Sequence, residues 1–139
     1  YVFPDEDNHK GIPWGNTIYN WSDSRNLSMN AKSESDGASN TEIIVKEQEE
    51  GNYAAKVCYD LEAYGYDDWY LPSKNELEAI FKNEKIAVGL NSCEAEFCGS
   101  IEYWSSTYSE DGIWTHNDYS GMNKCYFSSN SLRVRCVRK

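Results

Sequence analysis

Cysteine and histidine most often carry metal-binding, redox or nucleophilic chemistry, and this 139-residue chain has five cysteines and two histidines. No cysteine pair has Cys-x-x-Cys spacing, and only His9 and His116 could add imidazole ligands, so we expect no zinc site. The two histidines form no evident Ser-His-Asp triad, and the carboxylates stand in no recognisable glycosidase motif. The sequence therefore predicts a protein that is not an enzyme and has no resident cofactor.

Five cysteines in a small acidic domain favour an oxidising compartment. Cys93 and Cys98 could close a short loop. Cys58 and Cys136 lie on strongly patterned segments that both face the core, so we expect them to be close and to join the middle of the chain to its end. Cys125 would then remain a thiol. A cytosolic protein with five reduced cysteines stays open as an alternative.

The chain carries 23 acidic and 13 basic side chains, with a formal net charge of −10 and a pI near 4.6. Phosphate binding needs a basic surface, so no nucleic-acid partner is expected. No run of about 18 apolar residues occurs, which predicts no membrane insertion. Residues 1–139 have the length of a single domain. Because the chain opens with Tyr1 and shows no signal sequence, we expect a mature chain or an excised domain.

The chain is rich in aromatic residues, with eleven Tyr, five Trp and four Phe. Asn, Ser and Gly are also abundant. Together with Tyr these types are typical of binding loops, because they combine contact area with adaptable hydrogen bonding at low entropic cost. An aromatic core beneath a polar, turn-rich surface would explain the same composition.

The first half of the chain predicts loops followed by helices. Residues 1–40 form a loop-rich part without helical periodicity, and the polar stretch 22–40 is expected to be a surface loop. A short helix is expected over residues 41–50. A second helix should begin with Asn52 as N-cap and end with Gly65 at the C′ position.

A third helical pattern has the clearest start signal. Ser73 and Glu76 have the spacing of a capping box, and Leu77, Ile80 and Phe81 follow as an apolar stripe. We expect the helices beginning near Asn52 and Ser73 to be the two main helices of the domain.

The second half of the chain predicts antiparallel strands separated by turns. In the last strand Leu132, Val134 and Cys136 would share one face, and Arg133 and Arg135 the other. Helices followed by strands predict an α+β fold with the helices on one side of the sheet. The expected strands cover residues 101–107, 112–119, 124–129 and 131–139.

Specific motifs resemble the Lcl C-terminal domain family, whose members occur in bacterial surface and collagen-like adhesin proteins and among the variable proteins of diversity-generating retroelements. The resemblance covers residues 41–138 and rests on GYDDWYLPSKNEL, YWSST, the spacing of Trp104, Trp114 and Gly121, and the terminal RVR. It implies a C-type-lectin-like fold, with two main helices packed on a small twisted antiparallel sheet and long loops. Trp69 and Trp104 would be buried scaffold residues.

The resemblance also implies that residues 107–132 build an exposed ligand face. This stretch is rich in Tyr, Ser, Asn and Asp and lies between scaffold motifs. An ordinary polar hairpin surface is the alternative. His116 and Asp118 stand where the family more often has apolar side chains, which indicates either specific contacts or a different strand register. The candidate contacts are Tyr108, Thr115, His116, Asn117, Asp118, Tyr119, Asn123, Tyr126, Ser129 and Asn130.

Calcium-dependent sugar binding has weak support. The chain lacks the Glu-Pro-Asn and Gln-Pro-Asp triplets of calcium-dependent lectins, and Trp114 lies three residues before Asn117 rather than next to it. The pair Asn117–Asp118 alone cannot supply the six to eight oxygen atoms that calcium usually takes. We therefore expect no metal site, with calcium as the minor alternative.

These observations predict a non-catalytic ligand-binding module, extracellular or displayed on a cell or particle surface. Its macromolecular partner would be a protein or a glycan, held by the face of residues 107–132, which a retroelement could diversify. The alternative is a structural or trimerising cap domain of a surface fibre or adhesin, acting as a homo-oligomer.

Overall fold

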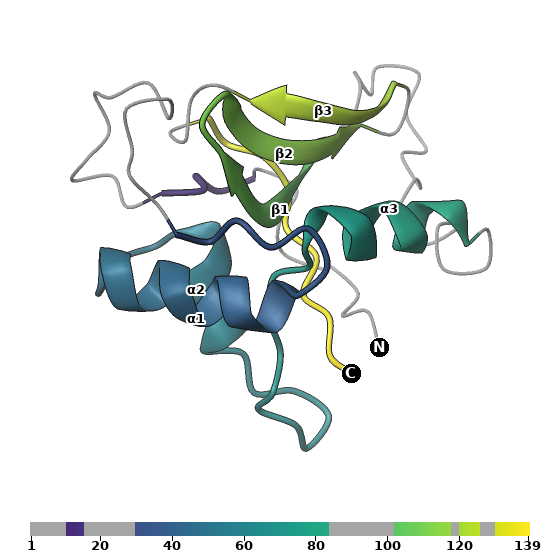
Figure 1. Ribbon diagram of the computed structural model, residues 1–139. Coiled ribbons are helices and arrows are strands. Elements are labelled where there is room, and N and C mark those ends of the chain that lie inside the picture. Colours follow the sequence, from purple (N-terminus) through teal and green to yellow (C-terminus); the bar gives the residue numbers. More distant parts are fainter. Residues whose placement is uncertain (1–10, 16–29, 84–101, 118–119, 126–129) are drawn as a thin grey trace.

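We describe the fold from a computed structural model of the chain. The described residues are 11–15, 30–83, 102–117, 120–125 and 130–139. They form an α+β structure, as predicted, in which three helices precede a three-stranded antiparallel sheet of order β1-β2-β3 (Figure 1). The elements are α1 (Gly37–Gln48), α2 (Ala54–Tyr59), α3 (Lys74–Lys82), β1 (Glu102–Ser109), β2 (Gly112–Asn117) and β3 (Gly121–Cys125).

Helix α1 begins earlier than the sequence predicted. The carboxylate of Asp36 accepts hydrogen bonds from the backbone N–H of Ser39, at 3.1 Å, and from its hydroxyl, at 2.8 Å. These bonds lower the pKa of Asp36 and cap the helix. The expected loop over residues 22–40 is therefore wrong at its end, because the polar residues that suggested a loop serve as the cap and first turn.

Helix α2 is shorter than predicted. It starts after Tyr53 rather than Asn52, without a side-chain cap, and it ends at Tyr59. Gly65 is not its C′ residue. That glycine has φ +80° in a tight turn farther along the chain. The helix closes with a tightened last turn, in which the Leu61 N–H donates to the Cys58 carbonyl, and the chain then enters the turn where Ala63 and Tyr66 exchange two hydrogen bonds.

Helix α3 has the predicted capping box. The Ser73 hydroxyl accepts from the Glu76 N–H, and the Glu76 carboxylate accepts from the Ser73 N–H at 2.8 Å. The same carboxylate accepts from the Gly37 N–H at 3.0 Å, so it also ties α3 to the start of α1. Leu77 and Ile80 are buried, as the apolar stripe predicted, and Phe81 is half-buried.

The sheet contains a bulge at its centre. The register of β1 and β2 pairs Trp104 with Thr115 and then Tyr108 with Ile113, so three residues of β1 face a single residue of β2. Strands β2 and β3 pair without interruption. The third strand covers Gly121–Cys125 rather than the expected 124–129, a correction of about three residues at its start.

The terminal segment, residues 132–138, is not a strand of the antiparallel sheet. It forms isolated bridges instead. Arg133 pairs with Tyr103 of β1 in parallel, Leu132 pairs with Ile12, and Val137 pairs with Tyr70. The predicted antiparallel placement was wrong because alternation reports which face is buried and says nothing of strand direction.

Both faces of the terminal segment are covered. Val134 and Cys136 belong to the main core, as predicted. Arg135, on the other face, is also buried, and its guanidinium lies 5.4 Å from the Tyr103 ring centroid. This burial lowers the pKa of Arg135 to about 10.

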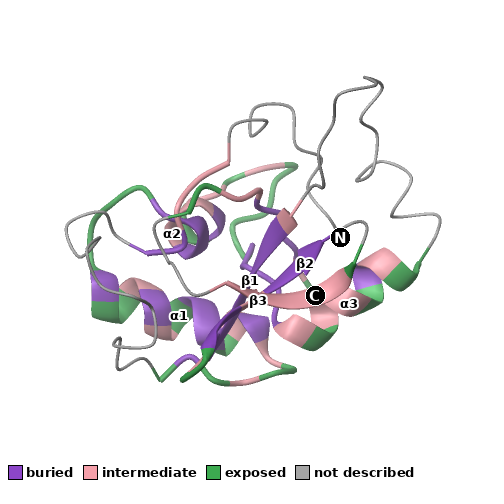
Figure 2. Cartoon of the chain, turned by 90° about the horizontal axis from the view of Figure 1, so that it is seen from above, coloured by how far each residue is buried: buried purple, intermediate pink, exposed green. Residues whose placement is uncertain are grey.

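One main core joins α1 and α2 to one face of the sheet, whereas α3 packs on the other face through Leu77 and Phe81. The predicted placement of the helices on one side of the sheet is therefore wrong, because strands β1 and β2 bury apolar side chains on both faces. Trp69 and Trp104 are buried, at 3% and 0% exposed, as predicted. Seen from above, β1 and β2 are largely buried, whereas β3 is intermediate along its length (Figure 2). Other members of this core include Trp14, Ile44, Tyr53, Leu71, Tyr108 and Ile113.

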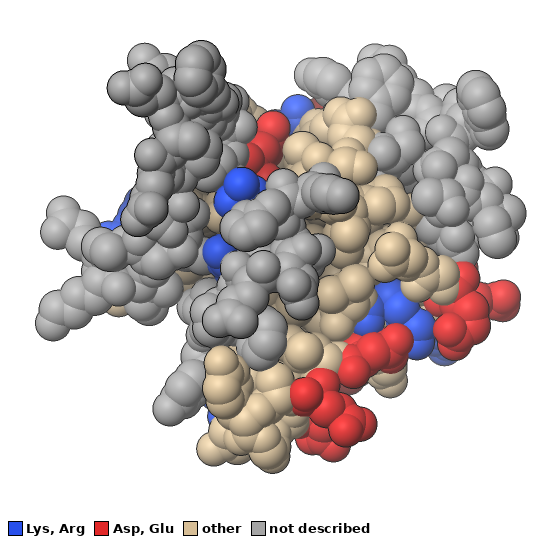
Figure 3. Space-filling model, turned by 180° about the vertical axis from the view of Figure 1, so that it is seen from behind, with Lys and Arg blue, Asp and Glu red and all other residues tan. Residues whose placement is uncertain are grey.

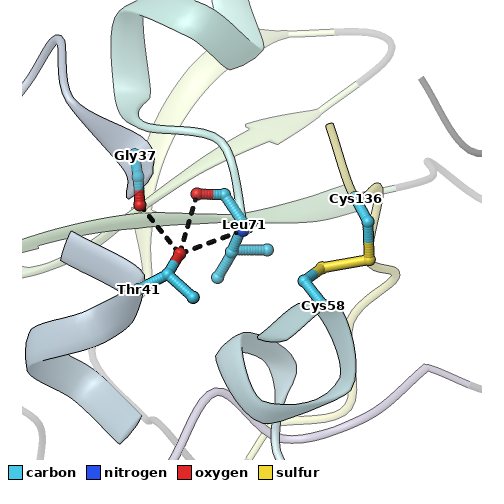
Figure 4. The surroundings of a disulfide bond; sticks show 5 residues. All are labelled: Gly37, Thr41, Cys58, Leu71 and Cys136. Atoms are coloured by element: carbon cyan, nitrogen blue, oxygen red, sulfur yellow. Dashed lines mark hydrogen bonds between the residues drawn. A yellow bond between two sulfur atoms is a disulfide. The ribbon is translucent and has the colours of Figure 1, made fainter. Parts of the chain in front are cut away.

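Cys58 and Cys136 form a disulfide, which confirms the predicted proximity of α2 and the terminal segment. Near it, the Thr41 hydroxyl of α1 donates to the Gly37 carbonyl at 2.8 Å and accepts from the Leu71 N–H at 3.0 Å (Figure 4). Cys125 is a half-buried thiol, as expected. The expected pairing of Cys93 with Cys98 lies outside the described residues.

Replacing Cys58 and Cys136 together by alanine should strongly destabilise the domain. The bond spans 78 residues, and the chain-entropy model gives about 4 kcal/mol for a loop of that length. Urea unfolding measures the loss, with Cys125→Ser as a control that removes a thiol without opening a loop. A double variant within about 1 kcal/mol of the parent would show that the bond does not form in solution.

Gly37→Ala should also destabilise the domain, although alanine is the better helix former. A Cβ at Gly37 would lie 2.5 Å from Glu76 Oε2 and 2.6 Å from both the Leu71 carbonyl oxygen and the Ser73 nitrogen. We expect a loss of about 1–3 kcal/mol in unfolding free energy. Gly65→Ala is the comparison, because space there is open and only its positive φ is strained. A Gly37→Ala variant as stable as the parent would contradict the close packing of α1 on α3.

Candidate functional site

Strand alternation divides the described strand residues of the range 107–132 between two faces of the sheet. On β2, Ile113 and Thr115 point into the main core, whereas Trp114 and His116 point to the face on which α3 packs. Cross-strand partners share a face, so Lys124 lies beside Trp114. The candidate contacts therefore cannot all meet one flat ligand.

Two of the predicted contacts lie in the core. Tyr108 is 2% exposed and its ring centroid is 6.4 Å from that of Trp14. Thr115 is fully buried, and its hydroxyl is hydrogen-bonded to the Glu102 carboxylate. These side chains stabilise the scaffold and are not available to a ligand, so both leave the candidate set. The sequence suggested them because Tyr and Thr are common both in binding loops and in buried strands.

His116 and Asn117 are also buried, at 8% each. The His116 ring stacks on Phe81 of α3, with centroids 3.9 Å apart and planes 7° apart. His116 therefore packs between helix and sheet and does not face a ligand. The Asn117 carboxamide oxygen accepts from the Ser120 N–H at 3.1 Å and shapes the turn into β3.

Two predicted contacts reach the surface. Asn123 on β3 is half-buried and donates to the Ser120 hydroxyl at 2.7 Å. Asn130 is exposed and donates to the Cys125 sulfur at 3.3 Å. The remaining candidates, Asp118, Tyr119, Tyr126 and Ser129, lie outside the described residues and stay predictions.

Trp114 is the centre of a surface group that the sequence analysis did not identify. The ammonium groups of Lys74 and Lys124 lie 4.1 and 4.7 Å from its ring centroid. Each lysine also has a carboxylate partner: Lys74 pairs with Glu34 at 3.2 Å, and Lys124 with Asp111 at 3.4 Å. We call Lys74, Trp114 and Lys124 the tryptophan site.

The chain positions the tryptophan site through three elements. Trp114 is held because its carbonyl accepts from the Ser105 hydroxyl at 2.6 Å, within the bulge of β1. Lys124 is its partner across the β2–β3 ladder, and Lys74 is the first residue of α3. Because neighbouring strand residues point to opposite faces, a buried Ile113 could have indicated that the Trp114 side chain points away from the main core. The contribution of Lys74 comes from a distant element, and no local pattern predicts it.

The chemistry of this site is that of binding. An indole can stack on a flat or apolar group, and ammonium groups donate hydrogen bonds and attract anions. Each cation–π contact contributes about 0.5–1 kcal/mol at an exposed position. Within the described part of the chain, no three His, Cys, Asp or Glu side chains converge on a point that could hold a metal ion.

The chain belongs to the Lcl C-terminal domain family, whose model matches residues 5–138 and so also covers most of the loop-rich first part. No curated protein and no solved structure matches the chain. Membership of this family suggests a surface-associated, adhesin-type domain, and the Cys58–Cys136 disulfide is consistent with an extracellular location. None of the described helices is long and apolar enough to cross a membrane.

Tyr108→Ala and Asn123→Ala should have opposite consequences although both residues were predicted contacts. Tyr108→Ala leaves a cavity in the core and should cost about 3–5 kcal/mol of unfolding free energy. Asn123→Ala changes a half-buried position on an edge strand and should stay within about 0.5 kcal/mol of the parent. Chemical denaturation of both variants tests the division into scaffold and surface, which equal losses would contradict.

Proposed function

We propose that this domain is a non-catalytic binding module of a surface adhesin, with a C-type-lectin-like fold. Its ligand, a protein or a glycan, would bind the tryptophan site together with the exposed residues of 107–132. The observation that carries this proposal is the half-exposed Trp114 with two ammonium groups over its ring. Tryptophan is among the residue types that most often dominate binding energy at interfaces.

A rigid support favours this assignment. Strands β1 and β2 are largely buried, and the disulfide fixes the terminal segment that runs beside β1. A surface held in one conformation loses little entropy when a ligand binds, so more of the contact energy appears as affinity. The support for the lectin-like fold is a small antiparallel sheet flanked by helices, with α1 and α2 on one face and α3 on the other.

Retroelement diversification is the finer part of the proposal. Residues 118–119 and 126–129 precede and follow β3 in the sequence and include four of the candidate contacts. Substitutions in connections perturb a scaffold less than substitutions in core strands. The test is the genomic neighbourhood, where a reverse-transcriptase gene and a near-copy of the 3′ coding end should be found. If neither is found, the proposal that a retroelement diversifies this domain is excluded, whereas the proposal of ligand binding is not affected.

Binding should depend on Trp114 once a ligand is found with a glycan array and a screen of surface proteins. We expect Trp114→Ala to weaken binding by about 2 kcal/mol or more. The same loss is expected for Tyr119→Ala and Tyr126→Ala if these residues are hot spots. Lys46→Ala is the control, because Lys46 is exposed on α1 and belongs to neither proposed surface. Titration calorimetry measures affinity, and thermal melting verifies that each variant is folded.

Two outcomes would contradict this function. Binding that survives the combined replacement of Trp114, Tyr119 and Tyr126 would exclude the face of residues 107–132. A domain that binds nothing in either screen but forms a stable trimer in solution would instead be a structural cap, and mass measurement detects that state.

A further inference from the structure

A second surface lies at the end of the molecule away from β3. Among the described large hydrophobic side chains, only three tyrosines are exposed: Tyr59 at 49%, Tyr64 at 69% and Tyr66 at 43%. Tyr59 is the last residue of α2, and Tyr64 and Tyr66 lie on the connection that follows it, which projects from the end of the molecule opposite β3 (Figure 1). Exposed aromatic rings gathered in one place are typical of protein interfaces.

A tight turn presents the outermost ring. Ala63 and Tyr66 exchange backbone hydrogen bonds of 2.9 and 3.0 Å, and the two residues between them have φ of +55° and +80°. Positive φ at both central residues is the geometry of a type I′ hairpin turn. Gly65 adopts it readily, whereas Tyr64 does so at a cost and carries its ring at the tip. The turn therefore holds a large side chain where it meets solvent.

Hollows lie on both sides of this turn. One, of about 660 Å³, runs between α1, the end of α2 and residues 67–70. The other, of about 490 Å³, lies along residues 62–67. Glu62 and Asp67 line both, so the two hollows form one continuous surface around the turn. We call the three tyrosines with Glu62 and Asp67 the tyrosine surface.

The larger hollow is predominantly acidic, although Lys56 pairs with Asp60 and Arg138 with Asp68 at its edge. The lining of the larger hollow includes no basic side chain. Among the described residues, Glu42, Glu62 and Asp67 form no ion pair, so their charges are uncompensated within that part of the chain. From behind, acidic side chains gather along the lower edge of the molecule, the end where this turn lies in Figure 1 (Figure 3). The carboxylates of the larger hollow belong to Glu42, Asp60, Glu62, Asp67 and Asp68.

The chain itself shows how this surface holds a cation. The Arg138 guanidinium donates to both carboxylate oxygens of Asp68, at 2.6 and 2.9 Å, and lies 3.5 Å from the Tyr66 ring centroid. The hydrogen bond to Arg138 lowers the pKa of Asp68, so that carboxylate stays ionised. Here a carboxylate and an aromatic ring together hold a guanidinium group. Glu62, Asp67 and Tyr64 offer the same two kinds of group along the second hollow.

We propose that the tyrosine surface docks a basic segment of a partner protein, with Arg or Lys side chains beside Glu62 and Asp67 and against the Tyr64 ring. The carboxylates do not converge on any point that could hold a metal ion, and their spread along two hollows suits an extended chain with several cations. The disulfide fixes α2 to the segment that carries Arg138, so the surface is formed before binding. This proposal does not depend on the ligand of residues 107–132.

The test uses the whole domain and a short fluorescein-labelled peptide of alternating Arg and Ser residues, followed by fluorescence anisotropy. A peptide of alternating Glu and Ser is the charge-reversed probe and should not bind. We expect Glu62→Gln with Asp67→Asn to weaken binding of the Arg peptide by about three- to tenfold, as the loss of two exposed ion pairs implies. Tyr64→Gly, which preserves the backbone conformation of the turn, should weaken it by about threefold or more.

The matched control is Glu47→Gln with Glu110→Gln, which removes the same two charges from exposed positions outside both hollows. It should leave binding unchanged within about twofold, apart from the small loss from lower net charge. If both double variants weaken binding of the Arg peptide equally, the peptide is attracted by the net negative charge of the whole protein, and the proposal is overturned. Full binding by Tyr64→Gly, or equal binding of the Glu peptide, would overturn it as well.

Discussion

The bulge in β1 is the constraint on which the rest of the structure depends. Between Trp104 and Tyr108 the strand leaves its ladder with β2, so the backbone and hydroxyl groups of Ser105–Thr107 are buried and must find partners elsewhere. These groups form hydrogen bonds with several neighbouring segments of the chain. The Ser106 N–H donates to the Pro72 carbonyl, the Thr107 hydroxyl donates to Ser33 and accepts from the first N–H of α3, and the Ser105 carbonyl accepts from the Trp14 indole. A regular strand could not connect so many separate segments.

The ends of the described chain meet on the other edge of β1. Leu132 pairs with Ile12, the Trp104 indole donates to the Ile12 carbonyl, and Arg133 exchanges hydrogen bonds with the backbone of β1. The disulfide at Cys136 then fixes this segment to α2. Sheet, helices and both ends of the described chain are thus held by a network of hydrogen bonds and one covalent bond. That network connects the three described strands to segments that are distant in the sequence.

Local signals predicted much of this fold. The capping box of Ser73, the buried face of Val134 and Cys136 and the burial of Trp69 and Trp104 all appear in the structure, because each depends on neighbouring residues or on simple burial. The direction of the terminal segment and the bulge were not predictable, since both are set by distant segments. The same limit applies to the site. Trp114 could have been identified from alternation, but Lys74 reaches it only because the first N–H of α3 bonds to Thr107.

The two proposed surfaces differ in charge, and this difference has a physical consequence. The tryptophan site presents two ammonium groups, whereas the tyrosine surface presents uncompensated carboxylates on the far side of the core. Exposed charges separated by more than about 8 Å of salt solution are largely screened from one another, so each surface selects its partner by its own local field. The carboxylates of the second surface would attract a basic segment. The ammonium groups of the first surface are each paired with a carboxylate, so a ligand there would depend mainly on the indole and on hydrogen bonds. If both proposals hold, the two partners would occupy different positions on the domain and would not compete with each other.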